Sequence, residues 1–515
     1  MNINAHRYQG RFFEWLVIIS CLLCVQSGSI ILAQNPDLFP CGTPVTKDPW
    51  RQQYLLHQLK FRTPAGELLQ IPLKIHLVGS DEGHGFYSYL KLMSALCQLN
   101  NDYLDAGIQF FIFEDIDYIY NSAWNNHETV LEGADMMFRN NDPRAINCYI
   151  ASSAAGNCGY NLPYAGVILA KSCVSGHTWA HELGHNLSLQ HPFLGWEGKT
   201  YSYDNPTPKT VTYDYTLFKD SLITDTTIID TAYVELVDGS NCTSAADRIC
   251  DTPPDYLSSR WQCDENSKST VLQKDFNGEE FYSDGTLFMS YSSDECQTRF
   301  TPGEIDLMRA TILHKKTFLL DVMPPVDKEV ADVNQLGFPS HEEEVPFDKV
   351  SLHWEPVAGA VKYVVQVSLN KSFTRIKYQG ITDTSVITFG LKTPRAYYWR
   401  VFAFGRTDYC SSASPRGQFV AIDPVSTNSP GNDVVHFHLH RGSDGRMTLR
   451  IAPFHAYRLT IDQYTVTGDR SSHPICIRPK STEQTVKLSS IPGLNIVVAK
   501  NSQQQLIFKK IYFNQ

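Results

Sequence analysis

Dense runs of lysine and arginine are absent from this sequence, in which 44 basic side chains stand against 54 acidic ones and the formal net charge is −10. A nucleic-acid surface needs clustered positive charge, so we expect no nucleic-acid partner. Long apolar runs are also missing after the first 34 residues, and we expect no transmembrane span there. The 515 residues, 42% of them hydrophobic, are still enough for two to four globular domains.

The one marked apolar run lies near the N-terminus, at residues 12–25, and follows Arg7 and Arg11. This order is typical of a secretory signal peptide, which we predict over 1–33. A membrane anchor is the alternative, but Glu14 interrupts the run, which is shorter than the ~20 apolar residues that a span needs. We therefore expect a secreted or cell-surface protein.

Cysteine, by contrast, is plentiful. Two of the 13 cysteines fall in the leader, and the remaining 11 are Cys41, Cys97, Cys148, Cys158, Cys173, Cys242, Cys250, Cys263, Cys296, Cys410 and Cys476. Export implies an oxidising compartment, so we expect several disulfides, and the odd count leaves at least one thiol free or paired elsewhere. The spacing leaves the connectivity open.

The first half of the chain alternates strand-like and helix-like segments. Strands are predicted at 70–78, 108–113, 145–151 and 166–170, and a helix at 87–104, before a further helix that carries the HELGH segment. This alternation predicts an α+β domain.

The second half changes character after a stretch rich in proline and acidic residues, which we predict to be a linker over 321–346. Short β-branched and aromatic runs follow at the spacing of a β-sandwich, at 350–354, 361–368, 385–389 and 397–404. After a second boundary at 423–433, more strands follow. We therefore expect two all-β sandwich domains, 347–422 and 434–515, after the α+β domain.

The segment HELGHNLSLQH carries the chemistry. His181 and His185 lie one helical turn apart, so their rings project from one face and can bind one Zn²⁺. Glu182 can reach the zinc-bound water, whose pKa falls from 15.7 to about 7, and act as general base. His191 supplies the third ligand if the helix ends near Ser188. The alternatives are a downstream glutamate as third ligand, with His191 incidental, and histidines that coincide by chance.

This pattern, HExxHxxxxxH, resembles the metzincin zinc motif, and HPFLGWEG after it is similar to the pappalysin branch, which includes the cytophagalysins and ulilysin. Further along, LFMSY at 287–291 and RFTP at 299–302 resemble the Met-turn region of that branch. The resemblance covers about residues 70–320. It implies a metzincin catalytic domain with a twisted mixed sheet, an active-site helix and a loop-rich lower subdomain. The implied activity is that of a zinc metalloendopeptidase with protein or peptide substrates.

The resemblance also implies roles for single residues. Met289 would form the apolar floor beneath the zinc, and the Tyr291 phenol would approach the metal and stabilise the oxyanion; simple packing is the alternative for both. Residues 159–169 would accept the substrate backbone by strand addition. Cys250, Cys263 and Cys296 are expected to staple the lower subdomain, with their partners open.

The resemblance also makes calcium a candidate second metal. Members of the family can bind calcium before the Met-turn, where this chain has the oxygen donors Asp247, Asp251 and Asp255. A full calcium-loop pattern is missing, so Ca²⁺ is secondary to Zn²⁺.

Two residues depart from the family pattern: Ser188 replaces the usual glycine, and Ser290 replaces a frequent aspartate. A serine forced to φ > 0 costs about 1–2 kcal/mol, which a packed domain can carry.

Residues 34–69 precede the first predicted strand, and we expect them to be a propeptide, cut near Arg62. Within this segment, Cys41 is a candidate latency thiol that would place a thiolate on the zinc, as in a cysteine switch. A disulfide or a plain free thiol is the alternative. The enzyme is therefore expected to be a zymogen.

The two β domains carry resemblances of their own. LHW at 352–354, GAVKY at 359–363 and YWRV at 398–401 resemble a fibronectin type III domain. Residues 486–511 look like a type IX secretion sorting domain, which implies an outer-membrane exporter of Bacteroidetes as a partner, although Ile496 replaces the central aromatic. The competing function is an adhesive or carbohydrate-binding surface protein whose metalloprotease-like part is inactive.

Overall fold

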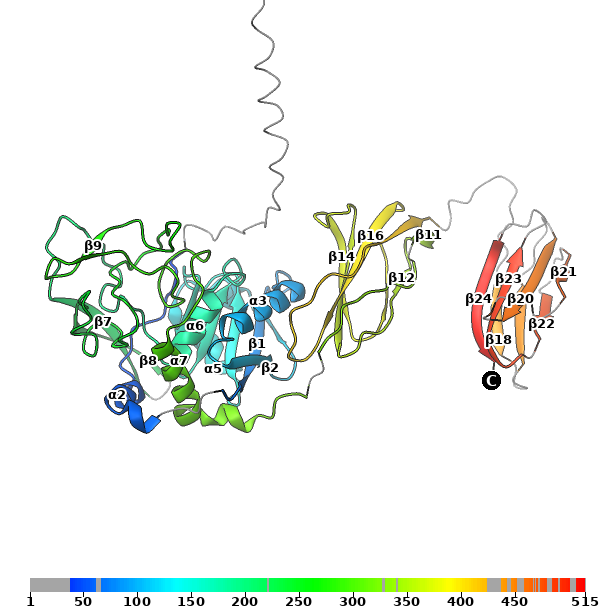
Figure 1. The fold of residues 1–515 in the computed structure, drawn as a ribbon. Helices are drawn as coiled ribbons and strands as arrows, with labels where there is room; N and C mark the ends of the chain where they lie inside the picture. The colour runs from blue at the N-terminus through cyan, green and yellow to red at the C-terminus, as the bar shows by residue number, and fades with distance from the viewer. Residues whose placement is uncertain are drawn as a thin grey trace, which may run out of the picture. The chain divides into compact units, whose positions relative to one another are not determined.

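The computed structural model describes residues 38–61, 66–219, 222–326, 329–339, 341–423 and 437–514, the last range with several short gaps. The predicted signal peptide and the predicted cut at Arg62 lie outside these residues. The described residues form an α+β structure with few helices and several separate sheets (Figure 1). Within them, no helix is long and apolar enough to cross a membrane.

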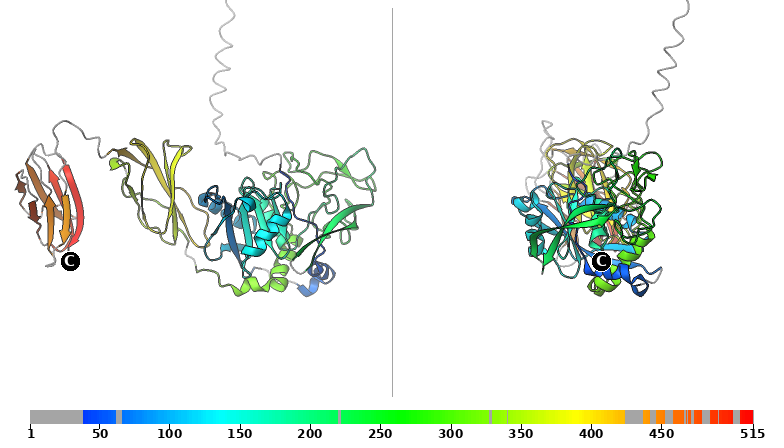
Figure 2. Two further views of the ribbon diagram at one scale, coloured as in Figure 1. Left: turned by 180° about the vertical axis from the view of Figure 1, so that it is seen from behind. Right: turned by 90° about the vertical axis from the view of Figure 1, so that its left-hand side faces the viewer.

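A mixed six-stranded sheet forms the core of the first half of the chain. Its strands are β1 (Leu69–Gly79), β2 (Ile108–Ile112), β3 (Asp117–Tyr120), β4 (Ile146–Ala151), β5 (Gly159–Leu162) and β6 (Gly166–Ala170). The order is β2-β1-β4-β6-β5, with β3 also paired to β1; β5 is antiparallel to β6 and the other pairs are parallel. Strands β1, β4 and β6 are almost wholly buried, as in a sheet covered on both faces. Figure 1 labels β1 and β2 of this sheet near α3, and Figure 2 shows the same blue to cyan region from behind.

The helices of this region are α3 (Tyr89–Asp102), α4 (Ser122–Asn125), α5 (Val130–Asn140) and α6 (Thr178–Asn186). Helix α3 buries Leu92, Leu96 and Leu99 in one apolar cluster with the inward side chains of β1. A capping box of Thr129 and Glu132 begins α5. Helix α6 contacts α3, β5 and β6. The predicted strands and the helix at 87–104 therefore all form, and they fix the helix that carries the HELGH segment.

The chain from 187 to 321 is rich in loops. Its elements are the hairpin β7 (Thr210–Lys219) and β8 (Leu222–Tyr233), the short pair β9 (Gln273–Lys274) and β10 (Glu280–Phe281), α7 (Pro302–Ala310), η2 (Thr311–Lys315) and η3 (Thr317–Asp321). The disulfides Cys242–Cys250 and Cys263–Cys296 close loops here, which confirms the stapling role expected of these cysteines. Before the sheet, the N-terminal segment forms α2 (Pro49–Leu56) and η1 (Gln58–Phe61).

Seven strands follow: β11 (His341–Pro346), β12 (Val350–His353), β13 (Lys362–Ser368), β14 (Ile376–Thr382), β15 (Val386–Phe389), β16 (Ala396–Phe404) and β17 (Gly417–Ile422). Strand β13 pairs antiparallel with β14 and β16. The disulfide Cys97–Cys410 ties this region to α3. Strand β11 lies inside the predicted linker; its three glutamates are exposed and only Val345 is buried, so the sequence shows no strand pattern there.

The last strands are β18 (Phe437–Arg441), β19 (Met447–Ile451), β20 (Leu459–Thr465), β21 (Ile475–Ile477), β22 (Gln484–Lys487), β23 (Gly493–Lys500) and β24 (Leu506–Asn514). They form two sheets, β18-β19-β22 and β21-β20-β23-β24. Leu449 and Ile451 of the first sheet share a buried cluster with Leu459 and Val497 of the second. Two antiparallel sheets over one apolar core are the architecture of a β-sandwich.

Candidate metal centre

Helix α6 and the turn after it bring three imidazoles together. His181 and His185 lie one turn apart on α6, with their Nε2 atoms 3.1 Å from each other. The helix ends at Asn186, and Ser188 then takes a left-handed conformation with φ of 76°. This reversal returns the chain to the helix, so that the Nε2 atom of His191 lies 3.2 Å from that of His181 and 3.1 Å from that of His185.

The other ring nitrogen of each histidine has an oxygen partner. Nδ1 of His181 lies 2.8 Å from the Phe288 carbonyl, and Nδ1 of His185 lies 3.0 Å from the Leu189 carbonyl. Nδ1 of His191 lies 3.3 Å from Oε1 of Glu197. Because a carbonyl only accepts, Nδ1 must carry the proton in the first two rings, and their Nε2 lone pairs point toward the common centre.

Burial disfavours any charge on these rings. It lowers the pKa of His181 to about 3, with a further contribution from His191, and it holds the pKa of His185 well below its ordinary value. Three neutral imidazoles whose lone pairs converge would repel one another unless a cation lay between them. Neutral imidazole is the form that binds Zn²⁺, so the donor set fits a metal.

A sulfur atom completes this donor set. Sγ of Cys41 lies 3.6 Å from Nε2 of His185, and the four ligand atoms of Cys41, His181, His185 and His191 all lie within 4.8 Å of one another. In the described part of the chain, no other group of three or more His, Cys, Asp or Glu gathers its ligand atoms so closely. Three imidazole nitrogens and one thiolate are a donor set that suits tetrahedral Zn²⁺.

The segment around Met289 lies beneath the imidazoles. Met289 is fully buried, and its Sδ atom lies so close to Gly184 that a Cβ atom there would meet it at 2.6 Å. The glycine of HELGH therefore makes room for the methionine. The Tyr291 ring packs 5.0 Å from that of His191 and its hydroxyl lies 3.4 Å from the Cys41 carbonyl. Ser290 donates to Asp255 at 2.8 Å, so the serine at this departure from the family pattern has a carboxylate partner.

Glu182 is fully buried beside the histidines. Burial raises its pKa to about 8, and hydrogen bonds from Thr43 and Cys41 oppose the rise. Thr43 donates to Oε2 of Glu182 at 2.6 Å and accepts from the Asn161 amide at 2.7 Å. Nothing in the sequence distinguishes Thr43 from other threonines, so this contact was not predicted.

The N-terminal segment runs along the edge strand β5. Gly42 donates to the Gly159 carbonyl at 2.8 Å, and Cys158 donates to the Phe39 carbonyl at 2.7 Å. Phe39 and Asn157 form a parallel bridge. This segment therefore covers the edge of the sheet at which the resemblance expects a substrate strand.

Two further side chains anchor the N-terminal segment, and neither could be recognised from its sequence context. Nε of the buried Arg51 donates to the Ser188 carbonyl at 3.1 Å, and the guanidinium also donates to the Asp247 carbonyl. Asp48 accepts from the Ser188 hydroxyl at 3.3 Å and pairs with Lys315 at 2.7 Å. The turn at Ser188 therefore holds the segment as well as positioning His191.

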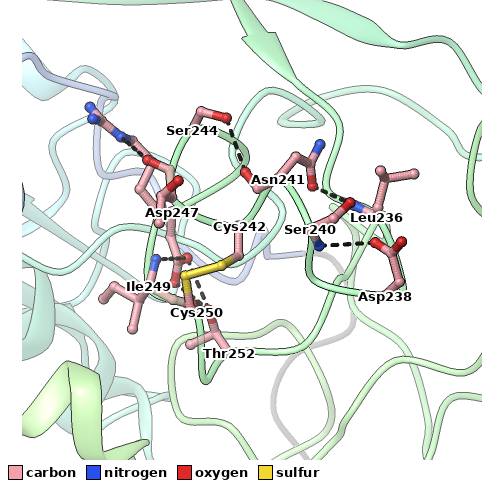
Figure 3. Close-up of a disulfide and its surroundings, with 12 residues drawn as sticks. Leu236, Asp238, Ser240, Asn241, Cys242, Ser244, Asp247, Ile249, Cys250 and Thr252 are labelled. Atoms are coloured by element: carbon pink, nitrogen blue, oxygen red, sulfur yellow. Dashed lines mark hydrogen bonds between the residues drawn. A yellow bond between two sulfur atoms is a disulfide. The ribbon is translucent and has the colours of Figure 1, made fainter.

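The three aspartates considered for calcium have separate partners. Asp247 lies inside the loop that Cys242–Cys250 closes, and its Oδ1 accepts from Ile249 and Thr252, both at 2.9 Å (Figure 3). Asp251 accepts from Gly303 at 2.8 Å. Asp255 accepts from Ser283 at 2.7 Å as well as from Ser290. These carboxylates do not form a common ligand group among the described residues, and calcium stays a prediction.

Comparisons with known proteins give matches of structure only. No protein-family model matches the chain, and no curated protein matches it. A mutant of promirolysin from Tannerella forsythia is 16% identical, with a TM-score of 0.36, and the match covers 55% of this chain and 96% of that one. FN3tt is 17% identical with a TM-score of 0.14, over 18% of this chain and 97% of that one. The fibronectin(III)-like modules of Clostridium thermocellum CbhA are 10% identical with a TM-score of 0.17, over 36% and 91%. The functional conclusion therefore depends on the site itself.

Proposed function

We propose that the chain is a secreted zinc endopeptidase of the metzincin type. The observation that carries the proposal is the convergence of the Nε2 atoms of His181, His185 and His191 beside the buried carboxylate of Glu182. A purely structural histidine cluster has no need of three inward lone pairs and an adjacent buried acid. These three histidines would hold the zinc, and Met289 would support them from below.

When bound, Zn²⁺ would polarise the peptide carbonyl and acidify a water at the site. Glu182 would take a proton from the attacking water on its carboxylate and return it to the leaving amine, so that water adds across the broken C–N bond. Tyr291 would donate a hydrogen bond to the negative charge that develops on the peptide oxygen. The free edge of β5 would hold the substrate backbone by strand addition.

The N-terminal segment would keep this site latent. Cys41 would supply the fourth ligand, and Thr43 occupies the Glu182 oxygen that the reaction needs. The edge of β5 is covered by the same segment. Cleavage after the segment, near Arg62 or elsewhere, would therefore free one coordination position of the metal, the Glu182 carboxylate and the edge of β5 at the same time.

Export is supported by four disulfides, which persist in oxidising compartments. The predicted signal peptide supplies the route out of the cytoplasm. We further propose that the C-terminal β-sandwich serves the type IX secretion machinery, on the sequence resemblance of residues 486–511.

The decisive experiment compares wild type with Glu182→Ala after removal of the N-terminal segment. We expect both proteins to bind about one zinc per chain, and only wild type to hydrolyse a generic protein such as casein. His191→Ala should lose zinc; full zinc retention in that variant would favour a downstream glutamate as third ligand. If processed wild type holds zinc but cleaves no protein or peptide, the proposal of an active peptidase is wrong.

A further inference from the structure

A cavity of about 770 Å³ lies directly beside the candidate metal centre. One wall comes from the end of α6 and its turn, with His185, Asn186 and His191. The opposite wall is the N-terminal segment around Asp48. Because two of the candidate zinc ligands line it, a side chain close to the cleaved peptide bond would enter this cavity.

Two of the charged side chains of the cavity are lysines, the last residue of η2 and the residue after it. Lys315 and Lys316 both line it. Nζ of Lys316 donates to the Asn186 side chain at 2.8 Å, one residue beyond the ligand His185. Nζ of Lys315 pairs with Asp48 at 2.7 Å. Lys315 thus has a carboxylate partner, and that carboxylate belongs to the N-terminal segment rather than to the catalytic domain.

The carboxylates that the catalytic domain itself contributes to the cavity are engaged elsewhere. Asp142 pairs with Arg144 at 2.7 Å. Glu197 accepts from the Gly195 amide at 2.6 Å and contacts His191 at 3.3 Å. Removal of the N-terminal segment takes away Asp48. Among the residues described here, Lys315 and Lys316 then have no nearby carboxylate of their own.

A carboxylate that enters the cavity would favour the charged form of Lys316. Burial, together with the charge of Lys315, lowers the pKa of Lys316 to about 7, and the charge of Asp48 opposes this lowering. A carboxylate near the two ammonium groups restores the favourable interaction that Asp48 now provides. A lysine or arginine side chain in the same place would add a third positive charge to a half-buried pair.

We infer that this cavity is a specificity pocket that selects an aspartate or glutamate side chain close to the cleaved bond, with Lys315 and Lys316 as its recognition groups. The inference rests on the proposed peptidase function, because it names the substrate class of that site. In this view, Asp48 fills the pocket in the latent protein with the same chemical group that a substrate brings to it.

The test uses the full-length chain after limited proteolysis of its N-terminal segment, together with alanine-based peptides in which one position is Asp, Glu, Ala, Lys or Arg. We expect wild type to cleave the acidic peptides at least about tenfold faster than the basic ones, since one unfavourable charge contact is worth that much. Lys315→Glu/Lys316→Glu should reverse the order. The matched control is Lys91→Glu, an exposed lysine on α3 outside the cavity, which should keep the wild-type order.

Binding separates this inference from the proposed function. The processed Glu182→Ala protein, titrated with the same peptides by calorimetry, should bind the acidic peptides more tightly than the basic ones. If the acidic peptides bind more tightly but wild type cleaves no peptide, the peptidase proposal is wrong and the inference of an acidic pocket stands. Cleavage or binding with no acidic preference, or a profile that Lys315→Glu/Lys316→Glu leaves unchanged, would overturn the pocket.

Discussion

Ser188 holds a backbone conformation that usually belongs to glycine, and it does so at the turn between two candidate zinc ligands. Its φ of 76° lies in the left-handed region, which is the conformation that the family resemblance implies for this position. The serine also offers what glycine lacks, because its hydroxyl donates to Asp48 at 3.3 Å. The residue with the strained backbone therefore also donates a hydrogen bond that holds the N-terminal segment.

Ser188→Gly should relieve the strain and keep the turn. We expect unchanged zinc content and activity after processing, and a gain of up to about 1 kcal/mol in the free energy of unfolding, limited by the lost Asp48 contact. Metal analysis and thermal unfolding of the two proteins measure both effects. Loss of zinc in the glycine variant would mean that the turn depends on the serine side chain in a way that the backbone does not reveal.

Cys41→Ala should weaken latency in the uncleaved protein. The thiol lies within reach of the three imidazoles, so its removal opens one coordination position. We expect activity of the unprocessed chain to rise at least about tenfold, the change that corresponds to about 1.4 kcal/mol. Peptide hydrolysis before and after processing measures it, and Cys476→Ala, which removes an exposed free cysteine, is the control.

Thr43→Val should add to the effect of Cys41→Ala. Valine keeps the shape of threonine but cannot donate to Glu182, whose Oε2 atom becomes available. The double variant should therefore be more active without cleavage than either single variant. Equal activity of the single Cys41→Ala and the double variant would show that Thr43 plays no part in latency.

At the scale of elements, α6 is anchored at its start by an ion pair. His177 precedes the helix, and its Nδ1 lies 2.9 Å from Asp102 at the end of α3. A positive charge at a helix N-terminus is unfavourable by itself. Burial alone would lower the pKa of His177, but the hydrogen bond and charge of Asp102 outweigh it and raise the pKa above the ordinary 6.5.

Stability should therefore depend on pH through this pair. Because the folded pKa is raised, the pair stabilises fully below pH 6.5, and its contribution is lost as the pH rises through the folded value. Asp102→Asn should lower the free energy of unfolding at pH 6 by about 1–3 kcal/mol, as for hydrogen bonds to charged groups, and by less at pH 9. Thermal unfolding across this range measures it, with the exposed Asp105→Asn as control.

Some of the strands could be predicted from the sequence and others could not. Strands β1, β4 and β6 were predicted from their sequences, β1 because its residues alternate, and all three are almost wholly buried. The hairpin of β7 and β8 was missed, although the threonines, tyrosines and isoleucines of 210–233 are typical of strands. Strand β14 was missed because its residues are mostly exposed or half-exposed and no apolar face forms.

For the site, the sequence could indicate only those neighbours that are close in the chain. The His181–His185 pair follows from helical spacing, and His191 from a turn six residues on. The partners supplied by distant segments could not be predicted. Thr43 and Lys316 reach Glu182 and Asn186 of α6, and Asp48 reaches Ser188 after it, through contacts between residues more than 100 positions apart. Sequence spacing carries no information about such contacts.

At the scale of the whole molecule, β16 and the loop after it contact the first half of the chain. The disulfide Cys97–Cys410 joins α3 to the loop after β16 across 313 residues. The Tyr409 hydroxyl accepts from the Ile112 amide at 2.8 Å, and Phe402 and Phe404 share the apolar cluster of α3. Both a covalent and an apolar contact therefore couple β16 and the loop after it to the region that contains α3.

Removing this disulfide should uncouple the two regions. A disulfide that closes a long loop restricts the unfolded chain most, so Cys97→Ser/Cys410→Ser should lower the free energy of unfolding by about 2–5 kcal/mol. The cysteines of Cys242–Cys250 are only 8 residues apart, so Cys242→Ser/Cys250→Ser should increase the entropy of the unfolded chain less. Calorimetry should show one shared transition in wild type and two in the Cys97→Ser/Cys410→Ser variant. Because Phe402 and Phe404 remain packed against α3 when the sulfurs are gone, zinc content at low temperature should not change. A single transition at the wild-type temperature would mean that the apolar contact alone couples the regions.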